Sequence, residues 1–175
     1  LTNAGVALKT DLVDEPKSPL LKTANPMKFK LCQSDTGMLM ARYPISLAQA
    51  AYLDEKDPNL GGVYENVVAQ ELTALGIPLW YYQSEQAGEV DFLIEGRSGK
   101  VVPVEVKSGK KARAHAALNH LLDIRDYKIP EAVVLSRNNL SQEGRVTYAP
   151  LYMTFCLDEL TEESVGDFSF APALP

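Results

Sequence analysis

The clearest apolar periodicity lies in residues 62–76, GVYENVVAQELTALG. Three- and four-residue steps connect Val63, Val67, position 71 or 72, and Leu75, which places them on one face of an α-helix. Gly76 is a natural stop for that helix, because glycine tolerates the left-handed conformation at a helix end. A second helix is predicted in residues 112–127, ARAHAALNHLLDIRDY, where leucines form an apolar stripe.

Shorter runs rich in β-branched and aromatic residues predict strands between and after these helices. The short connections between the first three runs favour an antiparallel meander, and the helix that follows favours a right-handed crossover to a parallel fourth strand. We therefore expect an α/β fold: a mixed sheet with an antiparallel fifth strand and helices on both faces. The predicted strands are PLWYYQ (78–83), EVDFLIE (89–95), KVVPVEVK (100–107), EAVVLS (131–136) and RVTYAPL (145–151).

The beginning and the end of the chain show weaker patterns. Residues 1–28 carry three prolines and scattered charges, and they are interpreted as the end of an upstream domain followed by a linker. The main domain is predicted to span residues 29–165, with a strand-like entry, a helix over residues 35–42 and a short closing helix in LDELTEESV. Residues 166–175 are predicted to be a loose tail. Because the sequence does not start with Met, we expect it to begin inside a longer protein.

Composition narrows the class of protein. The chain has 46% hydrophobic and 23% charged residues, which is typical of a globular domain. It has no apolar run near the roughly 18–20 residues that cross a bilayer, and no signal peptide is visible. A cytoplasmic protein without membrane contact is predicted, with Cys32 and Cys156 as free, buried thiols. The net charge of −6 argues against a protein that coats nucleic acid, although residues 100–113 hold five cations and one acid.

The predicted hairpin in residues 88–111 has two apolar runs, and charged residues stand inside them: Asp91 in the first, Glu105 and Lys107 in the second. Strand alternation places Glu105 and Lys107 on one face, and Asp91 shares the side of Leu93, opposite Val90. If Asp91 lies beside Glu105, two carboxylates meet at the edge of a buried sheet. They repel each other unless a cation lies between them, and Mg²⁺ or Mn²⁺ is the natural occupant. The alternative is an ordinary ion pair with one spare carboxylate.

This pairing makes a geometric demand on the hairpin. Asp91 opposite Glu105 requires Glu95 opposite Val101, with a turn over residues 96–100. Pro103 cannot donate a hydrogen bond to a neighbouring strand, so we expect it at a bulge or an unpaired position.

The segments GEVDFLI and VVPVEVKSGKK resemble the PD-(D/E)xK signature of the restriction-endonuclease-like nuclease superfamily. Asp91 matches its first acid and Glu105-Val106-Lys107 its E-x-K, although Val90 stands where the signature has proline. Glu65 matches an acid that many members carry on the first core helix. The resemblance implies the restriction-endonuclease-like fold and a metal-dependent endonuclease.

A narrower resemblance involves KFKLCQSDTGMLMA, GGVYENVVAQEL, WYYQSEQAGEVDFLIE and VPVEVKSG, in this order. Together they resemble a C-terminal domain of unknown function found behind AAA+ ATPase modules in bacteria and archaea. This resemblance implies an upstream ATPase domain of the same chain, and the opening residues resemble the end of its winged helix. No Walker A motif occurs in the sequence, so any ATP site is expected in that upstream domain.

These resemblances imply Mg²⁺-dependent hydrolysis of DNA phosphodiester bonds as the leading hypothesis. The ligands would be Asp91, Glu105 and the Val106 carbonyl, while Glu65 would reach a second ion or a bound water. Lys107 would orient the water or stabilise developing charge. One alternative is an inactive nuclease-fold module that docks a protein partner or regulates its ATPase, and another is a nucleic-acid clamp without chemistry. The residues expected to contact DNA phosphates are Lys110, Lys111 and Arg113.

Other polar and aromatic residues favour structural roles. His115 and His120 are five residues apart, which does not match the four-residue spacing of a helical metal pair, so surface positions are expected. Trp80 and its tyrosine neighbours could stack on bases, but packing in the core and at the sheet edge is favoured. Asp35 precedes a predicted helix and is expected to cap it.

Overall fold

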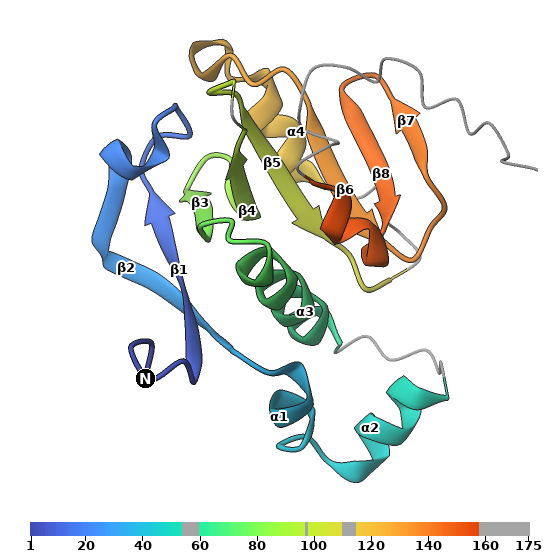
Figure 1. Cartoon of the computed structure of the whole chain (residues 1–175). Helices are drawn as coiled ribbons and strands as arrows, with labels where there is room; N and C mark the ends of the chain where they lie inside the picture. Colours follow the sequence, from blue (N-terminus) through green and yellow to red (C-terminus); the bar gives the residue numbers. More distant parts are fainter. Residues whose placement is uncertain (54–59, 97, 110–114, 158–175) are drawn as a thin grey trace, which may run out of the picture.

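The computed structural model describes residues 1–53, 60–96, 98–109 and 115–157. In these residues, one mixed sheet has the strand order β2-β1-β3-β4-β5-β6-β8-β7 (Figure 1). The elements are β1 (Ala7–Val13), η1 (Leu20–Thr23), β2 (Ala24–Gln33), α1 (Thr36–Met40), α2 (Ile45–Tyr52), α3 (Gly61–Ala74), β3 (Trp80–Ser84), β4 (Gly88–Glu95), β5 (Val101–Val106), α4 (Ala116–Asp123), η2 (Arg125–Tyr127), β6 (Ala132–Ser136), β7 (Ser141–Glu143), β8 (Val146–Pro150) and η3 (Leu151–Cys156).

The centre of the sheet confirms the predicted meander. Strands β3, β4 and β5 pair antiparallel in chain order, and β5 pairs with β6 in parallel after the connection that carries α4. The prediction of an antiparallel fifth strand is wrong, because β8 pairs with β6 in parallel. The short strand β7 pairs antiparallel with β8 across a turn at Gly144, so the chain reverses before β8 and enters the sheet in the direction of β6.

The N-terminal residues also belong to the sheet. Strand β1 pairs antiparallel with β2 and parallel with β3. Residues 7–13 and 24–28, which the proline-rich pattern assigned to a linker, therefore form strands beside the meander. Buried Leu12 and Val13 provide the apolar contacts that hold β1 there. The predicted closing helix and the tail of residues 166–175 lie outside the described residues.

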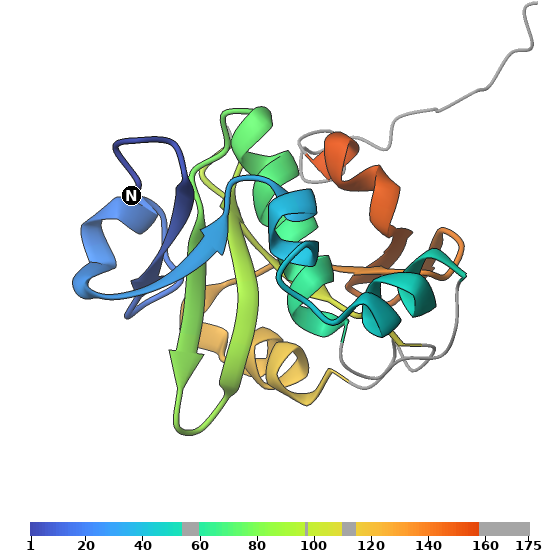
Figure 2. The same ribbon diagram turned by 90° about the horizontal axis from the view of Figure 1, so that it is seen from below.

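The described residues form two large apolar clusters, one that includes α4 and one that includes α3, and Figure 2 shows these two helices on opposite faces of the sheet. On one face, Leu118 and Leu121 of α4 pack with Leu93 and Tyr148. On the other, Val68 and Leu72 of α3 pack with alternate residues of β4, β5 and β6. Helices on both faces were predicted, and this prediction is confirmed. The burial of two apolar faces explains why β5 and β6 are apolar almost throughout.

Strand β4 departs from regular alternation next to Asp91. Trp80 and Tyr82 are two residues apart on β3, but their partners Leu93 and Val90 are three residues apart on β4. The extra residue places Val90 in the same apolar cluster as Leu93, which corrects the prediction that they face opposite sides. A bulge of this kind bends a strand and redirects a side chain.

Pro103 lies in register with Leu93 and not at a bulge of the β4–β5 pair, and of the two positions expected for it the unpaired one is found, on its β6 side. The amide of Lys107 donates to the carbonyl of Leu135 in β6, and backbone amides alternate in direction along a strand. The Pro103 nitrogen therefore faces the β6 side, one residue before the β6 pairing begins at Val104. No hydrogen bond to β4 is lost there.

Several smaller predictions can also be compared with the structure. Asp35 caps α1 as expected, because its side chain accepts a hydrogen bond from the Met38 amide at 2.7 Å. The tyrosines beside Trp80 are buried, in agreement with a packing role. His115 is buried and hydrogen-bonded to the Tyr148 hydroxyl at 2.8 Å, so the surface position predicted for it is wrong, whereas His120 is exposed.

The two cysteines are free, as predicted, but only half-buried. None of the helices in the described parts of the chain has both the length and the apolar character needed to cross a membrane.

Candidate active site

The β4–β5 hairpin has the register that the site requires. Its pairs run from Phe92–Val104 to Glu95–Val101, and the turn is closed by a hydrogen bond from the Gly96 amide to the Lys100 carbonyl. The predicted pairing of Glu95 with Val101 is thus confirmed. The next position along this register joins Asp91 and Glu105, just beyond the last ladder pair. The two acids therefore lie where the strands stop pairing.

Beyond the last ladder pair, the Asp91 side chain takes the place of a backbone partner for β5. Its Oδ2 accepts a hydrogen bond from the Val106 amide at 2.7 Å. Burial and the negative charges of Glu105 and Glu65 raise the pKa of Asp91 to about 7, against the opposing effects of the Val106 amide and Lys30. Asp91 therefore changes its charge near neutral pH. A bound cation would favour the charged form.

Glu105 is the most deeply buried acid of the site, with 6% of its surface exposed. Its Oε1 accepts from the Lys107 Nζ at 2.6 Å. Its Oε2 is buried and has no hydrogen-bond partner among the described residues. An unsatisfied buried carboxylate oxygen is costly, and a cation or a bound water would remove this cost.

The backbone of β5 presents a further oxygen to the same place. Within a strand, the amide and the carbonyl of one residue point to the same side. The Val106 amide points to Asp91, so the Val106 carbonyl also faces the β4 side, where ladder pairing has ended. Two carboxylates and one carbonyl form the kind of oxygen donor set that Mg²⁺ and Mn²⁺ prefer.

Glu65 approaches these acids from helix α3. Burial raises its pKa, the charges of Glu89 and Glu105 raise it further, and those of Lys30 and Lys107 lower it. Among the described residues, no group of three Cys, His, Asp or Glu side chains is arranged to hold a metal ion as it stands. The oxygen donors that fit a cation are those of Asp91, Glu105 and the Val106 carbonyl, and Glu65 interacts electrostatically with the two acids.

Lys30 is a charged residue of the site that sequence reasoning did not identify. Its Nζ pairs with Glu89 Oε1 and lies 4.6 Å from the centre of the Tyr81 ring. Its charge lowers the pKa values of Asp91 and Glu65. It comes from β2, a strand that is exposed or half-buried along its length and so lacks a regular burial pattern.

Buried Asn66 of α3 fixes β2 and α1 beside the site. Its Oδ1 accepts from the Gln33 amide at 2.7 Å, and its Nδ2 donates to the Gln33 carbonyl at 3.0 Å and to Thr36 Oγ1 at 2.9 Å. The Thr36 amide donates in turn to Gln70 Oε1 at 2.9 Å. We call Asn66 and its partners Gln33 and Thr36 the Asn66 clamp.

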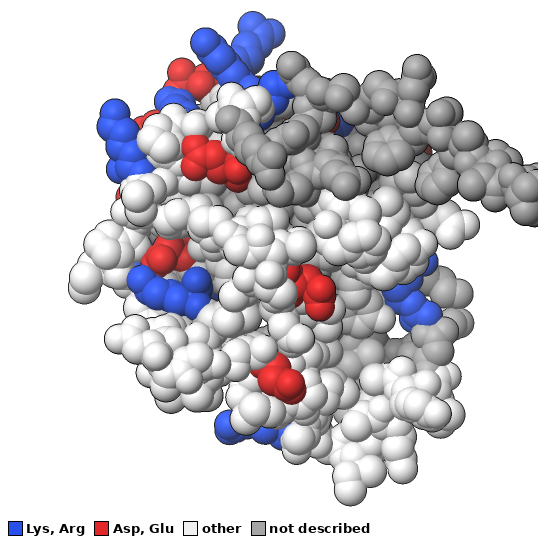
Figure 3. Space-filling view, in the orientation of Figure 1, with Lys and Arg blue, Asp and Glu red and all other residues white. Residues whose placement is uncertain are grey.

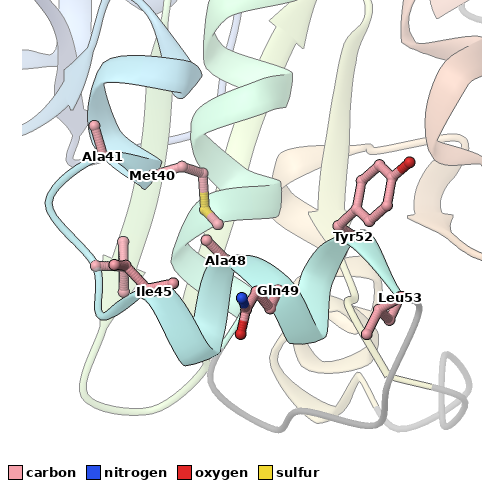
Figure 4. Close-up of a pocket in the computed structure, with 8 residues that line it drawn as sticks. Met40, Ala41, Ile45, Ala48, Gln49, Tyr52 and Leu53 are labelled. Atoms are coloured by element: carbon pink, nitrogen blue, oxygen red, sulfur yellow. The ribbon is translucent and has the colours of Figure 1, made fainter.

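Two hollows adjoin α1. The first, which we call the site cavity, has a volume of about 740 Å³. Its lining includes Lys30 of β2, Glu65 of α3 and Arg42, which follows α1. The second, the α2 groove, has a volume of about 520 Å³. Its lining is uncharged, and Figure 4 shows the Met40 side chain of α1 pointing toward Ala48 of α2.

The structure thus brings together four of the predicted site residues, Glu65, Asp91, Glu105 and Lys107, through hydrogen bonds or electrostatic contact. The predicted phosphate contacts Lys110, Lys111 and Arg113 lie outside the described residues.

Comparison with known proteins gave one family and no individual relative. A search of curated proteins found no match, and a search of solved structures found none. The family model DUF4143, described as a domain of unknown function, matches residues 60–153, which is more than half of the chain. The matched region contains Glu65, Asp91, Glu105 and Lys107. This chain therefore belongs to the DUF4143 family of domains.

Proposed function

We propose that this domain is a metal-dependent phosphodiesterase that acts on DNA, with a restriction-endonuclease-like fold. The observation that carries the proposal is the unpartnered, buried Oε2 of Glu105 beside Asp91. Two carboxylates at the end of a ladder, one of them with a pKa raised to about 7, store electrostatic repulsion that a divalent cation would relieve.

In this proposal the metal ligands, the amine and the acid of α3 have separate roles in hydrolysis. Asp91, Glu105 and the Val106 carbonyl would hold Mg²⁺ or Mn²⁺, which supplies a polarised phosphoryl oxygen and a more acidic water. Lys107 would leave Glu105 and donate a hydrogen bond to the attacking water or to a phosphate oxygen as negative charge develops. Glu65 would accept the proton of that water or orient it. The water oxygen forms the new bond to phosphorus, and the bond to the leaving oxygen breaks.

The experiment compares metal binding and cleavage in the same samples. Mn²⁺ is titrated into the wild type and the variants Asp91→Ala and Glu105→Ala, and each sample is then assayed on plasmid and linear DNA. We expect both variants to lose Mn²⁺ binding and Mg²⁺-dependent cleavage. Glu85→Ala, which removes an exposed carboxylate from the β3–β4 turn, is the matched control and should behave as wild type. Unchanged cleavage in Asp91→Ala would reject the site.

A second candidate function is docking onto an AAA+ ATPase module, without catalysis. DUF4143 domains are typically found with AAA ATPases. The observation that favours docking is the α2 groove, where Ile45 is 76% and Tyr52 is 90% exposed although both are large and apolar or aromatic. Exposed apolar surface of this kind is typical of protein-interaction sites. An intact set of acids without measurable metal affinity would favour this candidate over the nuclease.

A further inference from the structure

We propose that the site cavity binds the single-stranded end of a nucleic acid, with Arg42 and Lys30 as its phosphate contacts. This inference rests on the proposed phosphodiesterase function and names the form of substrate that the site receives. Its structural basis is the juxtaposition of a hollow with two cations and the acid cluster.

The side chains that line the cavity carry more positive than negative charge, whereas the chain as a whole is negatively charged. The chain has a net charge of −6, yet Lys30 and Arg42 both line the cavity, against Glu65. Arg42 is exposed and makes no ion pair within the described residues, so its guanidinium has all its donors available for a phosphate. Lys30 pairs with Glu89, but the side chains of this pair are 29% and 38% exposed. Partly exposed pairs contribute little, so a phosphate can displace Glu89.

Glu65 connects the cavity to the catalytic acids. It lines the hollow, and its charge raises the pKa of Asp91. The charge of Lys30 acts on both acids from the cavity side. Lys30 also pairs with Glu89 of β4, which lies two residues before Asp91 on the same strand, so a strand held by Lys30 would have a phosphate near the cation site of Asp91 and Glu105.

The form of the hollow favours a single strand over a duplex. A cavity of about 740 Å³ is within the size range of small-ligand sites, so it can receive the end of one strand but is far too small to enclose a double helix. On the face that Figure 3 shows, the described cations lie in small separate groups, some of them beside acids, and form no broad basic stripe.

The same wall offers a surface for a base. Tyr43 and Leu39 line the cavity beside Arg42, and an aromatic ring gives a sequence-independent stacking surface. The Asn66 clamp holds β2 and α1 against α3, so the wall is fixed before a ligand arrives. All of β2 and α1 lies before residue 60, outside the family match. Substrate selection would thus come from residues that precede the matched region.

The test is a binding assay in EDTA, which separates binding from cleavage. Fluorescence anisotropy is measured with an eight-nucleotide 5′-phosphorylated single-stranded DNA, the same sequence as RNA, and a blunt duplex of that DNA. The protein is the wild type, Arg42→Gln, Lys30→Met, and the controls Arg125→Gln and Lys22→Met, which remove exposed cations from η2 and η1. Circular dichroism confirms that each variant is folded.

We expect the single strands to bind more tightly than the duplex, and each cavity variant to weaken them about five- to tenfold. Arg42→Gln should also reduce the salt slope of single-strand binding by about 0.7, the value for one phosphate contact. The controls should bind as wild type. Equal or tighter duplex binding, no binding of any probe, or unchanged binding by both folded cavity variants would each overturn the inference. The RNA and DNA arms identify the preferred sugar.

Failure of the inference can be told apart from failure of the nuclease proposal. Arg42-dependent binding without Mg²⁺-dependent cleavage would reject the phosphodiesterase and retain the strand-binding cavity. Cleavage that is lost in Asp91→Ala but normal in Arg42→Gln and Lys30→Met would retain the nuclease and reject the cavity as its entrance.

Discussion

The site cavity and the α2 groove share a wall formed by residues 39–43, the end of α1 and the segment after it, but their chemistry differs. The site cavity carries Lys30, Arg42 and Glu65, and behind it lie two acids that repel each other. The α2 groove is lined by uncharged residues, and Tyr43 lines both hollows. Binding of a ligand in the site cavity would be stabilised by neutralisation of charge. Binding in the α2 groove would be stabilised only by the removal of apolar surface from water.

This difference shows that the volume of a hollow does not define its role. Both hollows are of the size of small-molecule and peptide sites. Of the two hollows, only the site cavity adjoins Asp91, whose pKa is raised to about 7 by burial and by neighbouring charge. Shifts of this kind are frequent at catalytic sites. Changes to the acids should therefore affect the first hollow alone, and changes to the shared wall should affect both.

The largest effect is expected from Lys107→Met. Lys107 is the only amine that contacts Glu105 in the described structure, at 2.6 Å, and it is the proposed donor to developing charge. Its loss should lower Mg²⁺-dependent cleavage by about 100- to 1000-fold, measured as the rate of plasmid relaxation under single-turnover conditions. Lys107→Arg, which keeps the charge, should lose less. Cleavage by Lys107→Met within a few-fold of wild type would contradict the assignment.

The next largest effect is expected from Asn66→Ala, which removes the clamp that holds the shared wall. Two backbone groups of Gln33 would lose their partner, and the Thr36 hydroxyl would keep only its hydrogen bond to Gln70 Oε1. Unsatisfied groups of this kind cost about 1–3 kcal/mol each, so we expect the free energy of unfolding to fall by about 2–4 kcal/mol in urea denaturation. Asn119→Ala, an exposed change on α4, is the control and should stay within about 0.5 kcal/mol. Equal stability of the two variants would show that the clamp does not hold the wall.

A smaller, pH-dependent effect is expected from Asp91→Asn. The pKa of Asp91 is raised from 3.8 to about 7 in the folded chain, so between these values the folded state binds more protons than the unfolded state. The wild type therefore loses stability as pH rises from about 4 to 7. Asp91→Asn removes this loss, and its gain in free energy of unfolding should be larger at pH 8 than at pH 5, by on the order of 1–2 kcal/mol.

Urea denaturation at both pH values measures this difference. Glu85→Gln, which changes an exposed carboxylate, should show no such dependence. A gain that is larger at pH 5 would mean that Asp91 is not held in a repulsive site.

The sequence was most informative where structure is local. The β4–β5 register could be predicted because the turn is short and a one-residue slip would reverse both faces. Position 91 in an apolar strand was a signal by itself, because an unpaired buried charge is costly. The bulge that redirects β4 was not visible, because it depends on how β4 meets β3.

The sequence was least informative where pairing joins distant residues. Strand β1 pairs with β3 across about 70 residues of chain, and no local pattern reports such a contact. Strand β7 has three exposed residues and no apolar pattern, yet it decides the direction of β8. Lys30 could not be assigned to the site for the same reason: its position follows from the β1–β2 pairing and the Asn66 clamp.

The smallest effect on the folded domain is expected from changes in the α2 groove. Tyr52 is 90% and Leu53 is 63% exposed, so Tyr52→Ser and Leu53→Ser remove little buried surface. The free energy of unfolding should change by no more than about 0.5 kcal/mol, and Mn²⁺ affinity and single-strand binding should equal those of the wild type.

If the groove docks an AAA+ ATPase module, the same two variants should weaken that association, measured by protection of the groove from hydrogen exchange when the module is added. Because none of the acids of the site lines the α2 groove, Glu105→Ala should leave this protection unchanged. Loss of protection in Glu105→Ala would mean that the two hollows act as one site, and the contrast between them would then have to be abandoned.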